Sequence, residues 1–515
     1  MSQLKKGALL NYATIFLTNA VGLFITPFIL NHVGNSEYGI YITIGALVGT
    51  ISVLDLGLNN TIVRFVAKYR AENDRKGEEN FLATTMLIYA VLSAMVFMFG
   101  FIFYGYIDTY FTKMNAEEIQ IAKTIFILLI FNIAIGLPGG SFTGICYGYE
   151  VFVFPKTVNL IRYVLRTLTV IGVLTLGGKA IALVVIDTVY NAIFLCIEIY
   201  YVFYKLKVKF KLHEFKLKYI KQIFSYSLWI FVFALVAMFQ WKAGHWVLGR
   251  IATPEVLTIY GIGITLGTYY GAFSTAISSL FLPKATQMTV NNATASDLTD
   301  VMIKIGRISF IVLMYIFIGF LLYGKEFVFL WVGSEIGRDG TNEIWLIALI
   351  IMIAYTVPLI QSFANLILEA KNKLAFKAKL YLFFMIVGTI FGGILAKKFN
   401  ALGMICGSVF GWILVQNVMN YYYYKNIDLN ILRFFKEIFN KTGIAIGIVL
   451  VIGFLIDLIP GFDWINFIAK GIVYSIVYII VLYLLGMRDS EKELLSPFFL
   501  ILKNKHKYFL KKPKI

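Results

Sequence analysis

Long apolar segments recur along this chain, each of about the length that crosses a lipid bilayer. Charged residues make up 14% of the 515 residues and apolar residues 59%, whereas soluble globular proteins carry roughly 25% and 45–50%. We therefore expect an all-α, polytopic membrane protein. This composition excludes a large water-soluble enzyme and a disordered chain. An outer-membrane barrel is excluded because it would show short alternating segments instead of long apolar runs. A membrane-spanning helix needs about 20 apolar residues, and the sequence predicts about 14 transmembrane helices, at approximately 8–30, 40–66, 81–104, 119–145, 156–177, 180–204, 222–248, 256–282, 304–323, 342–368, 374–396, 400–424, 441–459 and 465–486.

Lys and Arg residues are divided unevenly between the two sets of connections that alternate along the predicted spans. Of the 46 residues, 34 lie in one set, which includes both termini, or in the span ends beside it, 7 lie in the other set and the remaining 5 are assigned to the spans themselves. Lys and Arg collect on the cytoplasmic side of membrane proteins, so we expect both termini in the cytoplasm. The apolar run from about residue 8 to residue 30 exceeds the core of a signal peptide and indicates an uncleaved first helix. The net charge of +18 then reflects topology and contact with anionic lipid, since no nucleic-acid-binding motif accompanies it.

An eight-residue stretch occurs twice, at 38–45 and at 260–267, with six identical positions at an offset of 222 residues. Six predicted spans separate the copies, so both enter the membrane in the same direction, as in a parallel repeat of two lobes. The connection at 205–221 alternates Lys with apolar residues, which indicates either an interfacial linker between the lobes or a simple basic loop. The sequence thus predicts an N-terminal six-helix lobe at 1–204, a basic cytoplasmic linker at 205–221, a C-terminal six-helix lobe at 222–424, two extra transmembrane helices at 425–486 and a basic cytoplasmic tail at 487–515.

The sequence holds no motif for catalysis, for a cofactor or for a metal. The three cysteines and four histidines are scattered, and none of the spacings that bind zinc occurs. A phosphate-binding loop and the turn that carries a serine nucleophile are also missing. We therefore expect no enzyme activity, no cofactor and no metal. Function is expected from polar residues within the spans, which are unfavourable in lipid unless they face a protein interior or water.

Charged residues within and beside the predicted spans are the first candidates for a site. Arg162 and Arg166 lie on one face of their span, since they are four residues apart. Either they line a water-filled lumen, or Arg162 reaches the cytoplasmic interface and Asp55 or Asp187 pairs with these cations. The candidate substrate-binding residues are Asp55, Arg64, Arg162, Arg166, Lys242 and His245.

Uncharged polar residues at helical spacing form a stripe on span one, and a second polar stripe lies on span ten. Each stripe fits either a water-lined path or hydrogen bonds between helices. The possible lumen residues are Asn11, Thr14, Thr18, Gln361, Asn365 and Glu369. Helix-breaking residues occur at corresponding places in spans four and ten, and interrupted helices at matching places of two repeats indicate a transport site and its hinge. The hinge candidates, at which we expect both helices to break, are Pro138, Gly139, Gly140 and Pro358.

Several segments resemble the polysaccharide flippases of the Wzx type. They lie at 10–41, 54–70, 258–288 and 366–373, and the most specific match is the Asp55-Leu56-Gly57 motif with the following Arg64. The same superfamily holds multidrug and toxic compound extrusion antiporters and peptidoglycan lipid flippases, so the resemblance implies their fold over the whole chain. Many members carry an acidic residue where span seven nears its outer end. This chain has Lys242 and His245 there, which speaks against a cation-binding role at that place.

The resemblance implies a flippase that carries undecaprenyl-diphosphate-linked oligosaccharide from the cytoplasmic to the outer leaflet of a bacterial inner membrane. Its product would enter a surface polysaccharide, such as the O-antigen of lipopolysaccharide or a capsule. The implied partners are the lipid-linked oligosaccharide, the bilayer, and the proteins of polymerisation and chain length, without nucleic acid. A guanidinium can bind phosphate through two hydrogen bonds, so we expect Arg162, Arg166 and Lys242 to hold the diphosphate while two lobes rock about it. Two other functions stay open: a multidrug or organic-cation antiporter, which would need an acidic lumen, and a membrane enzyme of envelope glycan synthesis, for which catalytic motifs are missing.

Overall fold

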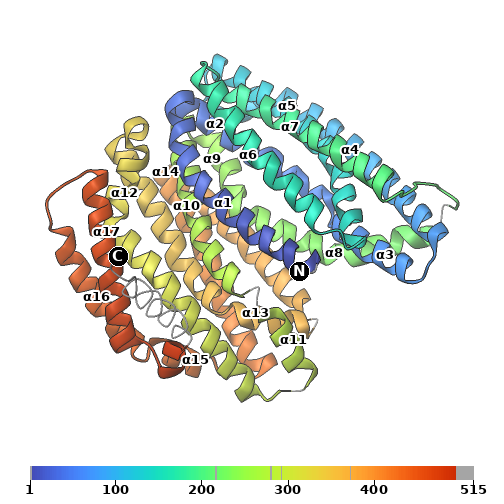
Figure 1. Cartoon of the computed structure of the whole chain (residues 1–515). Helices are drawn as coiled ribbons and strands as arrows, with labels where there is room; N and C mark the ends of the chain where they lie inside the picture. Colours follow the sequence, from blue (N-terminus) through green and yellow to red (C-terminus); the bar gives the residue numbers. More distant parts are fainter. Residues whose placement is uncertain (1–2, 215–216, 279–280, 292, 372, 494–515) are drawn as a thin grey trace, which may run out of the picture. The chain divides into compact units, whose positions relative to one another are not determined.

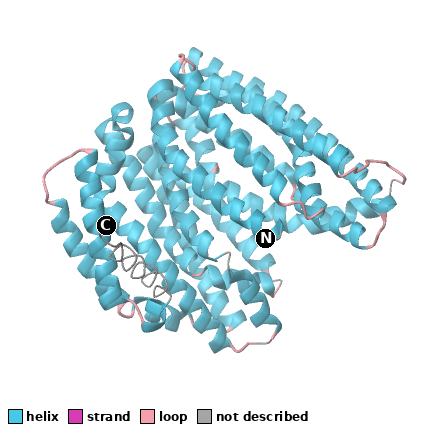
Figure 2. Cartoon of the chain, viewed as in Figure 1, coloured by secondary structure: helices cyan, strands magenta, loops and turns pink. Residues whose placement is uncertain are grey.

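Helices are the only regular elements in the part of the chain that the computed structural model describes, residues 3–214, 217–278, 281–291, 293–371 and 373–493 (Figure 2). The prediction of an all-α fold is therefore confirmed. The α-helices are α1 (Gln3–Val33), α2 (Asn35–Ile51), α3 (Leu58–Ala71), α4 (Arg75–Tyr110), α5 (Ala116–Gly148), α6 (Val153–Thr175), α7 (Ala180–Tyr200), α8 (Leu217–Trp241), α9 (Ala243–Ile251), α10 (Pro254–Ser278), α11 (Leu282–Val290), α12 (Ala295–Ile360), α13 (Ser362–Ala370), α14 (Leu374–Ile427), α15 (Ile431–Phe439), α16 (Thr442–Asp457) and α17 (Trp464–Val481).

Nine of the described helices are long and apolar enough to cross a membrane, or up to eleven segments if each of two bent helix pairs forms one span. Two of the nine are long enough for two crossings. α12 has 66 residues and is interrupted at Gly337, and α14 has 54 residues and is interrupted at Phe399 and Asn400. A helix rises about 1.5 Å per residue and the hydrocarbon core is about 30 Å thick, so each has the length of two spans. The chain is a multi-pass membrane protein, and the count of fourteen spans stays a prediction.

Internal contacts divide the chain into two compact units. Unit 1 holds Met1–Leu266, Trp331–Ile351 and Leu374–Val415, and unit 2 holds Gly267–Leu330, Met352–Lys373 and the described part of Gln416–Ile515. Within unit 1, α5 packs against α2, α3, α4 and α7 (Figure 1). Within unit 2, α16 and α17 pack against each other and against α12. The predicted lobes, 1–204 and 222–424, are defined by the sequence repeat, whereas these units are defined by internal contacts. The two lobes remain a prediction.

Within unit 1, α2 and the first part of α10 run in the same direction. α9 lies against α2 in antiparallel order, because Gly249 lies beside Thr43 and Lys242 beside Gly49. α10 follows α9 after a two-residue connection and turns back on it, so that Tyr260 packs against α9. Two helices that are both antiparallel to α9 are parallel to each other.

Two glycines at equivalent positions of the sequence repeat bring α2 and α10 together. Gly39 and Gly261 are 222 residues apart, like the two copies of the repeat. A Cβ atom at Gly39 would clash with Thr258 of α10, and one at Gly261 would clash with Ile42 of α2. Each of the two glycines therefore permits a close approach of α2 and α10.

The second predicted span, 40–66, is interrupted at the Asp55-Leu56-Gly57 motif. A 3-10 turn ends at Asp55, and Leu56 and Gly57 then adopt left-handed backbone conformations, with φ values of 53° and 71°. The Asp55 carboxylate accepts a hydrogen bond from the Tyr89 hydroxyl at 2.9 Å and further ones from the backbone N–H groups of Gly57 and Asn59. These N–H groups lie at the start of α3, where backbone donors have no partner within the helix. Asp55 therefore stabilises the helix break.

Gly57→Ala is expected to destabilise the protein. A Cβ at this position would lie 2.6 Å from the Ile230 side chain, and the left-handed conformation itself costs a residue with a Cβ roughly 1–2 kcal/mol. Thermal unfolding of the purified protein should shift to lower temperature. Gly45→Ala is the matched control, because a Cβ there would meet nothing within 4 Å. Equal unfolding temperatures for the two variants would contradict the observed break.

α5 remains helical through Pro138, Gly139 and Gly140, so the predicted break of span four is wrong. Proline has no backbone N–H, which leaves the carbonyl four residues earlier without its usual donor. In this protein the Ser93 hydroxyl of α4 donates to that carbonyl, on Ala134, at 2.7 Å. Membrane helices tolerate proline where a neighbour supplies the missing donor, and the sequence alone does not show that Ser93 is this neighbour.

The same compensation occurs at Pro27 in α1, where the Trp331 indole N–H donates to the Leu23 carbonyl at 2.6 Å. Near Pro358 the helix does break: α12 ends two residues later, and α13 begins beyond Gln361. The two predicted proline sites therefore differ: the helix continues through Pro138 and breaks just after Pro358. The role of all four predicted residues as hinges stays a prediction.

The basic linker leaves a π-helical turn at Lys205 and runs without regular structure to Glu214, where it docks against the start of α4. His213 and Glu214 donate their backbone N–H groups to the Asn80 side-chain oxygen at 2.8 and 2.9 Å. Val208 is buried, whereas the lysines on either side of it are exposed. Around Val208, the alternation of Lys with apolar residues therefore separates exposed side chains from a buried one. Residues 215–216 lie outside the described part, and the interfacial placement of the linker stays a prediction.

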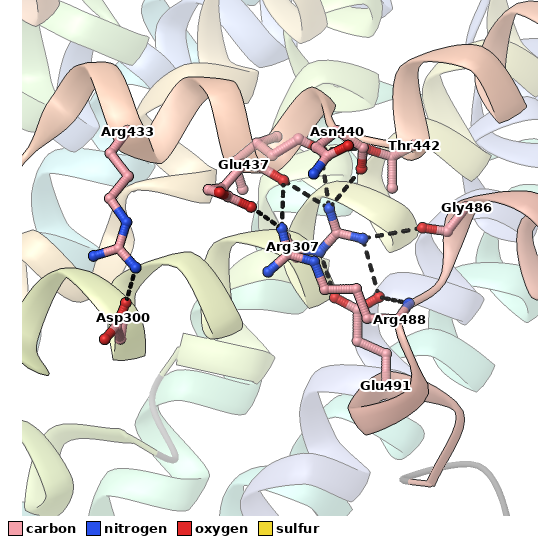
Figure 3. Close-up of polar contacts among 10 residues, drawn as sticks. Asp300, Arg307, Arg433, Glu437, Asn440, Thr442, Gly486, Arg488 and Glu491 are labelled. Carbon is pink, nitrogen blue, oxygen red and sulfur yellow. Dashed lines mark hydrogen bonds and ion pairs between the residues drawn. The ribbon is translucent and has the colours of Figure 1, made fainter.

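A fully buried guanidinium joins the C-terminal helices of unit 2 to α12 (Figure 3). Arg307 pairs with the Glu491 carboxylate at 2.5 Å through Nε and at 3.2 Å through Nη2. Its Nη atoms also donate to the backbone carbonyls of Glu437, Asn440 and Gly486, at 2.7, 3.0 and 3.0 Å. The α15–α16 connection and the segment after α17 are thus held at one point of α12.

Candidate functional site

A polar cavity of about 260 Å³ lies among α5, α6 and α7 in unit 1. It contains the predicted Arg162 together with the predicted hinge residues Gly139 and Gly140. Glycines at this wall keep the α5 backbone free of side chains and leave the space open. The lining residues with polar side chains are Thr143, Asn159, Arg162, Asn191 and Glu198.

Amide side chains in α5 and α7 connect Arg162 to the protein interior. Its Nη1 donates to the Asn191 side-chain oxygen at 3.0 Å. The Asn191 amide donates to the Asn132 oxygen at 3.4 Å, and the Asn132 amide donates to the Thr188 hydroxyl at 2.7 Å. Arg162 therefore points towards α7, and this arrangement differs from a side chain that only extends to the membrane surface.

Glu198 supplies the acidic group of the cavity. Its side chain is buried, and its carboxylate accepts a hydrogen bond from the Thr143 hydroxyl at 2.8 Å. The prediction of substrate-binding residues did not include Asn191 or Glu198. The signal was present, because Asp187, Asn191 and Glu198 are spaced by four and seven residues and so share a face of α7.

Arg166 forms a two-point ion pair with Asp187, one turn further along the same pair of helices. Nε and Nη2 donate to the two carboxylate oxygens at 2.7 and 3.1 Å. The Tyr41 hydroxyl lies within hydrogen-bonding reach of the same guanidinium. Of the two acids considered from the sequence, Asp187 is thus the partner, and the charge of Arg166 is balanced within unit 1.

Lys242 and His245 lie at a bend of 41° between α8 and α9, and neither lines the polar cavity. The Lys242 ammonium donates to the Gly49 carbonyl at 2.7 Å, shortly before α2 ends. His245 is buried, with its ring 5.1 Å from the Tyr260 ring. Within the described part of the chain, its Nδ1 atom has no hydrogen-bond partner.

The two polar stripes mostly make hydrogen bonds within the protein. Thr14 and Thr18 donate to the carbonyls four residues earlier in α1, at 2.8 Å each. Asn11 lies where the side chains are not described. In unit 2, Gln361 accepts from the Gln416 amide at 2.5 Å and Asn365 accepts from the Tyr423 hydroxyl at 2.8 Å, so both bond to α14, whereas Glu369 is exposed. Arg64 is exposed on α3 and does not line the cavity.

The fold is shared with known lipid and drug transporters. The lipid II flippase MurJ in an inward closed conformation matches with a TM-score of 0.73 at 14% identity, over 92% of this chain and 98% of that one. An inward-facing multidrug resistance MATE family transporter of the MOP superfamily matches with a TM-score of 0.63 at 14% identity, over 81% of this chain and 94% of that one. A MOP superfamily transporter from Pyrococcus furiosus has a TM-score of 0.51, also at 14% identity, over 84% of this chain and 94% of that one. At such identity the likeness establishes the fold.

The family follows from the sequence. The profile of the polysaccharide biosynthesis protein family matches residues 4–288. This is more than half of the 515 residues, and the chain belongs to that family. A comparison with curated proteins finds no match. The resemblance of the sequence to polysaccharide flippases is confirmed at the level of family and fold.

Proposed function

We propose that the protein is a flippase for surface polysaccharide synthesis. Its cargo is an undecaprenyl-diphosphate-linked oligosaccharide, which it moves from the cytoplasmic to the outer leaflet of the inner membrane by alternating access. The observation that carries this proposal is the polar cavity with Arg162 at its wall, inside a membrane protein of the polysaccharide biosynthesis family. A charged side chain inside a membrane segment usually marks a substrate path.

The chemistry of the cargo fits these residues. The head group is an anionic diphosphate joined to a polar glycan, and a guanidinium offers a diphosphate two parallel hydrogen bonds. In the proposed cycle Arg162 and Arg166 bind the diphosphate, Lys242 contributes a third positive charge, and Arg64 and His245 act in the same path. Pro138, Gly139, Gly140 and Pro358 serve as hinges. Polymerase and chain-length proteins would take up the product.

Glu198 favours a second candidate function. A buried carboxylate in a polar cavity is suited to bind an organic cation, as a multidrug antiporter requires. Glu198→Gln separates the two functions. Loss of drug resistance with retained polysaccharide would favour the antiporter, whereas loss of polysaccharide alone would favour the flippase.

The proposed function is tested in bacteria whose own polysaccharide flippase is deleted. Expression of this protein should restore surface polysaccharide and remove the lipid-linked precursor that accumulates inside the cells. The cells must make a glycan that this protein accepts, so the genes beside its own gene, with their glycosyltransferases, are supplied together. Precursor that stays inside cells with normal protein levels would count against the proposal.

Membrane topology gives a further prediction. We expect a cysteine at Lys209 to face the cytoplasm and a cysteine at Asp339 to face outward, because the cation bias places the linker inside. Both positions are exposed, and Asp339 is preferred to Gly337, whose φ of 75° disfavours a side chain. A thiol reagent that cannot cross the membrane should label Asp339→Cys in intact cells and Lys209→Cys only after lysis. The reverse pattern would invert the proposed topology.

A further inference from the structure

A second, apolar cavity lies in unit 1, outside the polar cavity. Its volume is about 670 Å³, and side chains of α2, α4, α5 and α9 line it. Ile102 and Tyr106 of α4 line it and are 53% and 62% exposed, so the cavity is a groove that opens sideways from the unit. The volume lies in the range of small-molecule binding sites, roughly 300–1,000 Å³.

The groove follows α4 from Phe99 to Tyr110. Eleven helical steps of about 1.5 Å give a length of roughly 16 Å, about half of the 30 Å hydrocarbon core. The groove is thus about as long as one leaflet of the core is thick. The end of the groove near Phe99 is lined by Phe99, Phe103 and Phe126. These aromatic side chains suit a hydrocarbon chain and offer no hydrogen bonds.

The other end of the groove is polar and contains two donors that the protein leaves available. Arg250 is exposed, and no acidic residue in the described part forms an ion pair with it. The indole N–H of Trp246 is buried and has no partner among the described residues. A buried donor without a partner is unfavourable, and a ligand at this end could satisfy it.

Hydrogen bonds hold this polar end in shape. The Tyr110 hydroxyl donates to the Trp246 carbonyl at 2.8 Å, and the Thr112 hydroxyl donates to the Arg250 carbonyl at 2.7 Å. Both bonds join the end of α4 to α9. These bonds fix the backbone that carries Arg250 and Trp246, so that this backbone need not be ordered when a ligand binds.

We propose that this groove binds the polyprenyl chain of an anionic lipid carrier, with the phosphate at Arg250 and Trp246. The proposal rests on the proposed function and its topology, which place Arg250 on the outer side. It adds a site at which the carrier rests in the outer leaflet after its head group has crossed. A single groove that follows α4 accepts one chain, which favours a polyprenyl phosphate over a two-chain phospholipid. The positive charge of Arg250 favours the phosphate over a neutral head.

The test is photolabelling of the purified full-length protein in neutral-lipid nanodiscs with a polyprenyl phosphate that carries a diazirine in its chain. Residue-level mass spectrometry should place the label on groove-lining positions such as Ile102 and Tyr106. Arg250→Gln should lower this labelling about tenfold, as expected for loss of a charge-assisted contact. Ile102→Trp should also lower it, because the larger side chain fills the groove.

Two control variants separate the groove from the general lipid surface. Phe101→Trp enlarges a neighbouring residue that is 79% exposed and does not line the groove, and Lys397→Gln removes another exposed cation of unit 1. Neither should change the labelling. An excess of unlabelled polyprenyl phosphate should compete, whereas equal amounts of neutral polyprenol or phosphatidylglycerol should not.

Several outcomes would overturn the proposal. Labelling that Arg250→Gln leaves unchanged, or that polyprenol prevents equally well, would remove the phosphate site. Equal competition by phosphatidylglycerol would make the groove a general lipid site. The readout is binding, so it is independent of transport: failed labelling beside restored surface polysaccharide would refute the groove alone. Specific labelling beside absent transport would refute the proposed function alone.

Discussion

Arg166→Ala should abolish export of the finished glycan while the protein still inserts into the membrane. The change removes a two-point ion pair at 2.7 and 3.1 Å and leaves the Asp187 charge inside a membrane segment without its cation. Arg166→Lys should restore export only in part, because an ammonium lacks the planar fork of a guanidinium. Surface polysaccharide and accumulated precursor are measured in cells without their own flippase. Normal surface glycan with Arg166→Ala would remove this residue from the transport site and make Lys242 the preferred candidate.

The role of the ion pair is resolved by changing its other partner. If Arg166 serves only to pair with Asp187, exchanging the two charges with Arg166→Asp and Asp187→Arg should restore export. If Arg166 binds the diphosphate, the exchanged protein should stay inactive, and Asp187→Asn should retain activity because the guanidinium remains. Lys123→Ala is the control: this cation also lies in a predicted span, but its partner Asp108 is 53% exposed, and its loss should have little effect.

Arg307→Ala should cause the largest loss of stability among single substitutions in unit 2. Arg307 is fully buried, and Glu491 would lose its only described cation. Removal of one partner of a buried ion pair costs about 3–5 kcal/mol, and three backbone carbonyls would also lose the hydrogen bond that Arg307 donates to them. We expect a low protein level and a strongly lowered unfolding temperature in detergent. Arg307→Met, of similar length, should not rescue it, because a thioether cannot donate to the carboxylate or to the carbonyls, and the Glu491 charge would lose its cation.

Arg433→Ala is the matched control for Arg307→Ala. Arg433 pairs with Asp300 at 2.6 Å, close to the same network (Figure 3), but the two side chains are 42% and 53% exposed. Exposed ion pairs contribute roughly 0–1 kcal/mol, so the unfolding temperature should hardly change. Similar destabilisation by both variants would show that burial of the Arg307 network does not matter.

The positions of the helices could largely be predicted from the sequence, because apolar runs of span length are a local property. The predicted spans at 119–145 and 180–204 correspond to α5 and α7. The interruptions of helices could not be predicted equally well. The break at Gly57 depends on positive φ values and on Tyr89, and the continuity at Pro138 depends on Ser93. Such partners lie tens of residues away, so no local pattern reveals them.

The candidate site could be predicted in part. Helical spacing placed Arg162 and Arg166 on one face, and both side chains point to α7. Asp187 is one of the two acids that the sequence offers as a partner, and Asn191 could have been found by the same spacing argument applied to the next helix. The partner of Lys242 is the backbone carbonyl of Gly49, which every residue possesses and which therefore leaves no trace in the sequence.

The most direct test of the proposed function is translocation by the purified protein. Proteoliposomes are loaded with lipid-linked oligosaccharide extracted from cells that accumulate it, and the glycan is exposed to a glycosidase that cannot cross the membrane. With the wild-type protein, nearly the whole pool should become accessible over time, because molecules of the inner leaflet reach the outside. With Arg166→Ala, only the pool that was outside at the start should be cleaved. If the wild-type protein gives the same cleavage as protein-free liposomes, the chain is not a flippase for this lipid.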